Sequence, residues 1–270
     1  MLGINLGTVH RTDYRTDRRT ERRTDRRTER GALGIRLAIL ALLIGLAVLG
    51  YRIPAKSKRV LNDLDAHFVV LDLKSGKYRV SPALASGEDG FESFASMVDR
   101  LQPYAAISGT YHDPDSRPLG DIVIDGRVVN RGCERQGIGF TRDGAIKFLE
   151  RSGDSKINWN GCESGIACGP RLLKDGRVDI DLERDGFTSK AGTIMARRCA
   201  VGASADGKLI LCAVGKPVTL AKLAELMKEV GAQDAVNLDG GSLCALYEEG
   251  DYHAEPFGPV TNMLVVHPSQ

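Results

Sequence analysis

The sequence predicts an α+β fold, a single domain in which antiparallel or mixed sheets are built from hairpins and a few helices pack against them. Three observations indicate this class. Short apolar runs alternate with glycine-containing turns along most of the chain, as expected of hairpin strands. Only two segments repeat their apolar residues at helical spacing. A chain of 270 residues, 42% of them hydrophobic, is long enough to bury one substantial core.

Residues 1–30 form an arginine-rich tail that we expect to be disordered. Arg11–Arg30 repeats Arg-Thr-Asp-Arg and Arg-Thr-Glu-Arg units and has almost nothing apolar to bury. Two other interpretations stay open: a basic tail that binds anionic lipid or RNA, and translated sequence upstream of the true start. Residues 1–51 hold ten arginines against five acids. The rest of the chain is therefore mildly acidic and lacks a broad basic surface for nucleic acid.

Residues 31–51 are predicted to be a transmembrane signal anchor. Leu37–Gly50 is continuously apolar, and extending it back to Gly31 gives about 20 residues, near the length that crosses a bilayer core. The preceding arginines favour an N-terminus inside the cell, with the domain in the periplasm or at the cell exterior. A cleaved signal peptide and a buried core helix are the alternatives. Residues 52–67 form a charged connector to the domain at 68–270.

Four hairpins are expected, each around a glycine-containing turn. Their strands are Phe68–Leu73 with Tyr78–Ser81, Asp121–Ile124 with Arg127–Val129, Arg171–Leu173 with Arg177–Ile180, and Cys199–Gly202 with Lys208–Val214. Apolar periodicity predicts one helix over Phe91–Leu101. It predicts a second over Leu220–Val230, with Thr219 as N-cap and Gly231 after its end.

Six cysteines permit three disulfides and fit an extracytoplasmic domain without requiring it. Cys133 and Cys162 lie in loops and are the first pair to test. Cys168, Cys199 and Cys212 have the surroundings of core residues, and buried free thiols remain the alternative for all six. No spacing is typical of metal ligands and no His-Glu-x-x-His segment is present, so no metal or other cofactor is expected.

The segment Ala235–Cys244 carries the strongest functional signal. An apolar strand ends at Asn237-Leu238 and runs directly into Asp239-Gly240-Gly241-Ser242. Glycine lets a ligand approach the main chain closely, and successive free N–H groups can bind an anion. A polar turn with no function is the alternative, because Asp-Gly is a common turn pair.

Four ordered blocks of the sequence resemble a known family. They are Gly109–Asp113 with Pro118–Asp121, Ala167–Arg171 with Asp175-Gly176, Arg198–Gly202 with Asp206–Val214, and Leu220–Val230 running into Gly231–Ser242. Together they resemble the phosphodiester glycosidase family, over about Phe68 to Val266. The resemblance implies a hydrolase whose substrate is a carbohydrate phosphodiester.

The resemblance also implies the site residues. Asp239 and Glu163 would be the catalytic carboxylates, and Arg198 would hold a phosphate oxygen. Substrate contacts are expected from Thr110, Asp113, Asp121, Asn237, Gly240, Gly241 and Ser242. Ser108 stands where many relatives have Asn, and His112 is either a general acid or a structural residue.

These observations favour a membrane-anchored hydrolase that cleaves a glycosyl phosphodiester in an envelope or extracellular glycan. The alternative is a non-catalytic module of the cell envelope that binds a glycan phosphate. A structural envelope protein with an inactive domain is a third possibility. The substitution Asp239→Asn separates the first two, because a binding module should keep much of its affinity.

Overall fold

The computed structural model describes residues 62–269. The predicted tail (1–30), the predicted anchor (31–51) and residues 52–61 of the connector (52–67) therefore lie outside the described residues. Over residues 62–269, every helix falls short of the length and apolar character that a membrane span requires.

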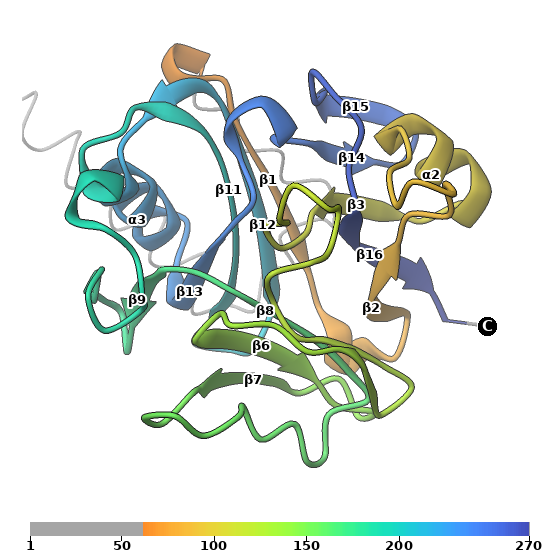
Figure 1. Ribbon diagram of the computed structural model, residues 1–270, viewed down its shortest axis with the longest axis horizontal. Coiled ribbons are helices and arrows are strands. Elements are labelled where there is room, and N and C mark those ends of the chain that lie inside the picture. Colours follow the sequence, from red (N-terminus) through yellow and green to blue (C-terminus); the bar gives the residue numbers. More distant parts are fainter. Residues whose placement is uncertain (1–61, 270) are drawn as a thin grey trace, which may run out of the picture. The chain divides into compact units, whose positions relative to one another are not determined.

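Three sheets make up the fold (Figure 1). The six-stranded sheet has the order β1 (Ala66–Leu71), β12 (Leu209–Val218), β11 (Ala196–Ser204), β13 (Ala232–Leu238), β9 (Arg171–Lys174) and β10 (Arg177–Val178). A five-stranded sheet has the order β15 (Asp251–Ala254), β14 (Leu246–Glu248), β3 (Ala105–Ser108), β16 (Asn262–Pro268) and β2 (Tyr78–Leu84). The other five-stranded sheet has the order β5 (Arg127–Asn130), β4 (Ile122–Ile124), β8 (Ser164–Cys168), β6 (Gln136–Phe140) and β7 (Ile146–Glu150).

Three of the four expected hairpins are confirmed, and one is wrong. The pairs β4–β5, β9–β10 and β11–β12 are antiparallel neighbours, as predicted. By contrast, β1 pairs with β12 and β2 pairs with β16, so these two strands belong to different sheets. A 3₁₀ turn, η2 (Leu73–Ser75), lies between them and buries Leu73. This turn redirects the chain, and each strand then pairs along its whole length with a distant partner.

Within residues 62–269, two α-helices lie on the outer faces of the sheets. In α2 (Phe94–Leu101) the hydroxyl of Ser93 accepts a hydrogen bond from Ser96 N, so the helix begins three residues later than predicted. In α3 (Leu220–Glu229) Thr219 caps the first turn as predicted, by accepting from Lys222 N. Gly231 follows with a φ of +98°, a conformation that glycine adopts without strain. The short 3₁₀ helices η1 (Asn62–Leu64), η3 (Ser189–Gly192) and η4 (Gly241–Leu243) complete the elements.

The main core lies between the three sheets. It combines Val69 and Val201 of the six-stranded sheet with Ile107 and Leu264 of one five-stranded sheet, and with Ile138 of the other. A second cluster packs α3 against the outer face of the six-stranded sheet, and a third packs α2 against the sheet that holds β3 (Figure 1). The α+β prediction is therefore confirmed in its broad form. All the strand pairings found within residues 62–269 are antiparallel.

Candidate active site

The ends of three strands, one from each sheet, meet at a single place. Asp239 follows β13, and its backbone N–H donates to the carbonyl of Gly109, which follows β3 (2.9 Å). The backbone N–H of Asn237 donates to the carbonyl of Pro170, just beyond β8 (3.0 Å). Gly109 has no room for a side chain, because a Cβ would lie 1.9 Å from Asn262 Oδ1. The fold thus brings together segments that are far apart in the sequence.

Asp239 is a mostly buried carboxyl at this junction. Burial raises its pKa to about 6, while a hydrogen bond from Gly240 N and the charge of nearby His112 act in the opposite direction. The Gly240 N–H donates to Asp239 Oδ1 over 2.8 Å, and so it orients the carboxyl. The N–H expected to face a substrate is engaged by Asp239 in this structure, and its role in substrate binding stays a prediction. A carboxyl that changes its charge near neutral pH is suited to accept or donate a proton.

The turn that carries Asp239 is pressed against β11. A Cβ on Gly240 would lie 2.7 Å from the Arg197 carbonyl oxygen, so only glycine fits there. Gly241 has a φ of +58° and space around its Cα. Glycine is therefore favoured there by the backbone conformation and not by a lack of space. Ser242 is exposed, and its carbonyl accepts from Phe257 N (2.7 Å). The expected role of its hydroxyl in binding stays a prediction.

Arg198 lies beside the same junction, and its guanidinium is already partly engaged. Nε donates to the Val218 carbonyl (3.3 Å) and Nη2 donates to the Ile194 carbonyl (2.7 Å). The Nη1 group has no partner among residues 62–269. Burial lowers the pKa of Arg198, and the nearby Tyr111 opposes this shift. Two of the five N–H donors of the guanidinium thus fix the side chain, and the Nη1 amino group is left for a ligand.

Several polar atoms around Tyr111 are buried without hydrogen-bond partners. Asn237 Nδ2 donates to Tyr111 Oη (2.5 Å) and to the Gly169 carbonyl (3.1 Å), but its Oδ1 has no partner. The Thr110 hydroxyl lies next to the Cys168 thiol and makes no hydrogen bond of ordinary geometry. Buried polar groups normally have partners. Unsatisfied atoms that gather at one place therefore point to a bound polar ligand.

Glu134 is a second buried carboxyl in this region, and the sequence reasoning missed it. Burial raises its pKa to about 7, with a further contribution from the charge of Asp185. Its Oε2 has no partner and lies 3.5 Å from the position of a Cβ on Gly169. Burial raises the pKa of the Tyr111 hydroxyl, with further contributions from Cys168, Glu134 and Asp239, and with Arg198 opposing. Tyr111 therefore lies within electrostatic range of both carboxyls and of the arginine.

Asp121 positions the segment that carries Glu134. It is buried and accepts from Arg131 Nη1 (2.8 Å), from Gly132 N (2.9 Å) and from the indole N–H of Trp159 (2.8 Å). The backbone N–H of Glu134 then donates to the Leu119 carbonyl (3.2 Å). With three donors bound, Asp121 serves the structure of the loop, and its expected contact with substrate is not supported.

Two predicted site residues lie away from the junction. Glu163 precedes β8, whereas the site follows the other end of this five-residue strand, a separation of roughly 16 Å at strand geometry. Its carboxylate forms an exposed ion pair with Arg142 (3.0 Å), which lowers its pKa. Asp113 Oδ1 accepts from Arg117 N (2.9 Å) within a surface turn. The structure therefore does not support catalysis by Glu163 or substrate binding by Asp113.

The structure also tests the predicted disulfide and shows whether side chains that could bind a metal ion lie close together. All six cysteines are free thiols, including Cys133, which is exposed, and Cys162, which is buried. The structure therefore contains no disulfide between Cys133 and Cys162, the first pair that the sequence proposed to test. In the part of the chain described, no three His, Cys, Asp or Glu side chains are grouped closely enough to hold a metal ion.

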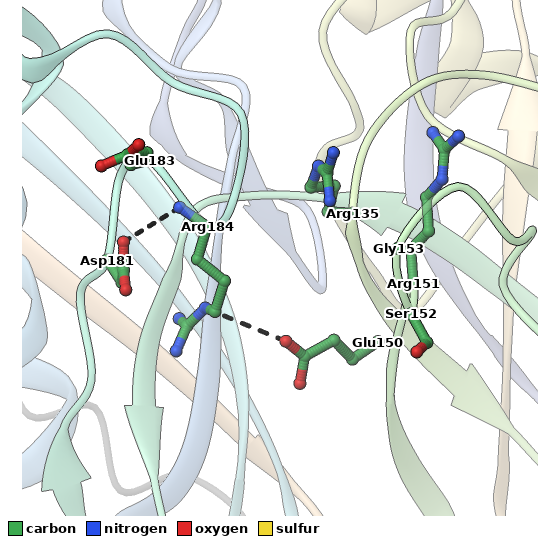
Figure 2. Close-up of a pocket in the computed structure, with 8 residues that line it drawn as sticks. All are labelled: Arg135, Glu150, Arg151, Ser152, Gly153, Asp181, Glu183 and Arg184. Atoms are coloured by element: carbon green, nitrogen blue, oxygen red, sulfur yellow. Dashed lines mark hydrogen bonds and ion pairs between the residues drawn. The ribbon is translucent and has the colours of Figure 1, made fainter.

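An open pocket of about 660 Å³ lies next to the Glu134 segment but contains none of the predicted site residues. Figure 2 shows that the backbone N–H of Arg184 donates to Asp181 and that its guanidinium reaches toward Glu150. Arg135, directly before β6, and Arg151, directly after β7, lie on the other side of the pocket. Three arginines and three acids line this pocket, so their charges balance. It therefore lacks the excess of positive charge that would mark an anion site.

Comparisons with known proteins identify the family and support the fold. Residues 102–267 match the family model described as phosphodiester glycosidase. A mouse N-acetylglucosamine-1-phosphodiester alpha-N-acetylglucosaminidase is 27% identical over 158 residues, which cover 51% of this chain but only 30% of the mouse protein. The zebrafish catalytic domain of the enzyme with the same name, auto-inhibited by its pro-peptide, superposes with a TM-score of 0.62 at 22% identity, covering 75% of this chain and 76% of that one. A hypothetical protein from Synechocystis superposes with a TM-score of 0.66 at 17% identity, covering 74% of this chain and 58% of that one.

Proposed function

This chain belongs to the phosphodiester glycosidase family, and we propose that its domain hydrolyses the bond between a sugar and a phosphodiester. Membership confirms the family that the sequence blocks indicated. Family membership leaves open which substrate is cleaved and which residues act on it, and we propose both below. The mouse relative is named for cleavage of an N-acetylglucosamine-1-phosphodiester, so a sugar-1-phosphodiester is the class of substrate to consider first.

One observation carries the proposal. Two buried carboxyls, Asp239 and Glu134, both have pKa values raised by burial to about 6 and about 7. Both lie within electrostatic range of Tyr111, as does the cationic Arg198. Most enzymes that break glycosidic bonds use a pair of carboxyls, and the one that acts as general acid has a raised pKa. Because the family resemblance and this geometry arise from different observations, they support the same function independently.

The polar atoms without partners suggest how the substrate binds. Arg198 Nη1 is the free N–H group of a guanidinium that two carbonyls hold in place, and it would donate to a phosphate oxygen. Asn237 Oδ1 would accept from a sugar hydroxyl, and the Thr110 hydroxyl would bind beside it. Binding would then satisfy atoms that the free protein leaves buried and unpaired, which is a favourable exchange.

The two carboxyls divide the proton transfers. Asp239, with the lower pKa, is the carboxylate that faces the anomeric carbon, as base or as nucleophile. Glu134, with the higher pKa, is the protonated carboxyl that donates to the departing phosphate. Carboxyls of like charge raise each other's pKa when they lie close together. The charge that acts on the pKa of Asp239 is that of His112, and the charge that acts on the pKa of Glu134 is that of Asp185. One carboxyl can therefore be ionised while the other is protonated.

We further propose that residues 31–51 anchor the protein in a membrane and that the domain acts outside the cytoplasm on an envelope or extracellular glycan. The proposal rests on the length of the apolar run, on the arginines before it, and on a phosphate-bearing glycan as the substrate class. Fractionation of cells that express the full chain would test it. Recovery of the intact chain in the soluble fraction would contradict the anchor.

The decisive experiment compares three forms of the full chain, purified in a mild detergent. Release of free sugar is measured from methyl phosphodiesters of N-acetylglucosamine and of other hexoses. The unmodified chain should turn over at least one of them. Asp239→Asn should lose turnover by at least roughly a hundredfold, as expected when a general base or nucleophile is removed, while Glu163→Gln should retain it. Binding without turnover by the unmodified chain would favour the non-catalytic module instead.

A further inference from the structure

Two thiols face each other directly beneath the proposed active site. Cys199 belongs to β11 and follows Arg198, and Cys244 follows η4 at the end of the turn that carries Asp239. Their Sγ atoms are 3.3 Å apart, although 45 residues separate them in the sequence. Both side chains are completely buried. Among the six cysteines, this is the sulfur–sulfur contact that the structure shows within hydrogen-bond range.

The strongest hydrogen bonds around the pair connect the turn to Ser108, at the end of β3. The Ser108 hydroxyl donates to the Leu243 carbonyl (2.5 Å) and accepts from Ala245 N (2.9 Å), on either side of Cys244. The Cys199 thiol lies 3.7 Å from the same hydroxyl, and the Cys244 thiol lies 3.5 Å from the Arg198 carbonyl. Thiols are weak hydrogen-bond partners. The hydrogen bonds of the two thiols therefore add little to the attachment of the turn to β11, whereas a disulfide would join the two covalently.

The two sulfurs are also chemically unequal. Burial raises the pKa of the Cys199 thiol. A hydrogen bond from Cys199 lowers the pKa of the Cys244 thiol, and the charge of Arg197 lowers it further. Cys244 is therefore the sulfur that more readily becomes a thiolate, and the thiolate is the form that attacks a disulfide.

We propose that Cys199 and Cys244 are a disulfide site, oxidised by exchange with the disulfide of a thiol oxidoreductase or of a small-molecule donor. The Cys244 thiolate attacks one sulfur of the donor, which breaks the donor's S–S bond and releases one donor thiolate. Cys199 then loses its proton and attacks the Cys244 sulfur, which releases the second donor thiolate. The protein loses two electrons and two protons, and the donor gains them when its disulfide becomes two thiols.

The new bond would tie the Asp239 turn covalently to the strand that carries Arg198. The sulfurs need to approach by little more than 1 Å to reach the length of a disulfide bond, about 2.05 Å. Exchange would take place while β11 and η4 are still accessible during folding, and the closed structure would then protect the bond from reduction. An extracytoplasmic domain meets the oxidising conditions that this requires, and in this respect the inference rests on the proposed location.

Mass spectrometry of the full chain tests the inference without any assay of activity. The protein is made by export into an oxidising compartment, unfolded, alkylated, and digested with and without reductant. A peptide pair joined through Cys199 and Cys244 is the expected result. Six alkylated cysteines, or a cross-link between other cysteines, would overturn the inference. A positive map with no hydrolysis of any sugar phosphodiester would leave this site in place and count only against the proposed function.

Thermal unfolding gives a second and independent measurement. Reduction should lower the melting temperature of the oxidised chain by roughly 5–15 °C, as expected for a bond that closes a loop of this length in a domain of this size. Cys162→Ala removes a buried thiol elsewhere and should show the same difference. Cys199→Ala and Cys244→Ala should show none, and each variant serves as its own reference. An equal difference in all three variants would refute the assignment.

Discussion

Replacing Glu134 with Gln should stabilise the protein at alkaline pH while it impairs catalysis. Burial raises the pKa of Glu134 from 4.5 to about 7. The folded state therefore holds this proton more tightly than the unfolded chain does. The stability that the proton provides is complete below pH 4.5, declines as the pH rises, and is lost above pH 7. Glutamine keeps the size of the side chain and never ionises, so it avoids this decline.

The magnitude follows from the shift of the pKa. A rise from 4.5 to about 7 corresponds to a loss of about 3 kcal/mol at pH 8. At pH 5 most of that loss has not yet occurred, so the advantage of Gln should grow by roughly 2–3 kcal/mol between pH 5 and pH 8. For a domain of about 200 residues this is a change of roughly 5–10 °C in the difference between the two melting temperatures.

The assay is thermal unfolding of both full-length forms at pH 5 and pH 8. Glu163→Gln is the matched control, because Glu163 lies on the surface in an ion pair with Arg142 that lowers its pKa. This control should gain nothing at alkaline pH. If the difference in melting temperature for Glu134→Gln is the same at both pH values, Glu134 is not a buried carboxyl with a raised pKa. The argument for its role in the site then fails.

The remaining predictions concern activity. The value of kcat/KM should rise around pH 6 as Asp239 loses its proton and fall around pH 7 as Glu134 does, and a profile flat from pH 5 to pH 8 would contradict these roles. Arg198→Lys should lower kcat/KM roughly ten- to a hundredfold, because lysine lacks the planar fork in which Nε and Nη2 donate to two carbonyls while Nη1 stays available for a phosphate, and each charge-assisted bond is worth about 1.5–3 kcal/mol. Steady-state kinetics that equal those of the unmodified chain would refute this prediction. Gly240→Ala should lower the melting temperature more than Gly241→Ala, because only the former places a Cβ 2.7 Å from a backbone oxygen of β11; the opposite order in thermal unfolding would show that the turn does not pack as described.

Signals confined to a few neighbouring residues were sufficient to predict much of this protein. Aspartate followed by glycine marks turns with positive φ, and Asp125-Gly126 and Asp175-Gly176 adopt that conformation between paired strands. Thr219 and Gly231 delimit α3 for reasons that are also local. The segment Asn237–Gly241 stands out because a buried strand ends in a carboxylate and two glycines. These features could be identified in sequence because their causes act over a few residues.

Only the tertiary structure decided which strands pair and which side chains meet at the candidate site. The sequence predicts β1 and β2 as a hairpin, but each finds its partner more than 100 residues away. Glu163 and Glu134 are both loop acids in the sequence. Glu163 forms a surface ion pair. Glu134 is buried near Tyr111, because Asp121 holds the loop of Glu134 against the end of β8. Strand periodicity fixes which face a side chain occupies, but it does not fix which strand ends meet. Burial and the pKa values that depend on it therefore follow from the packing of three sheets.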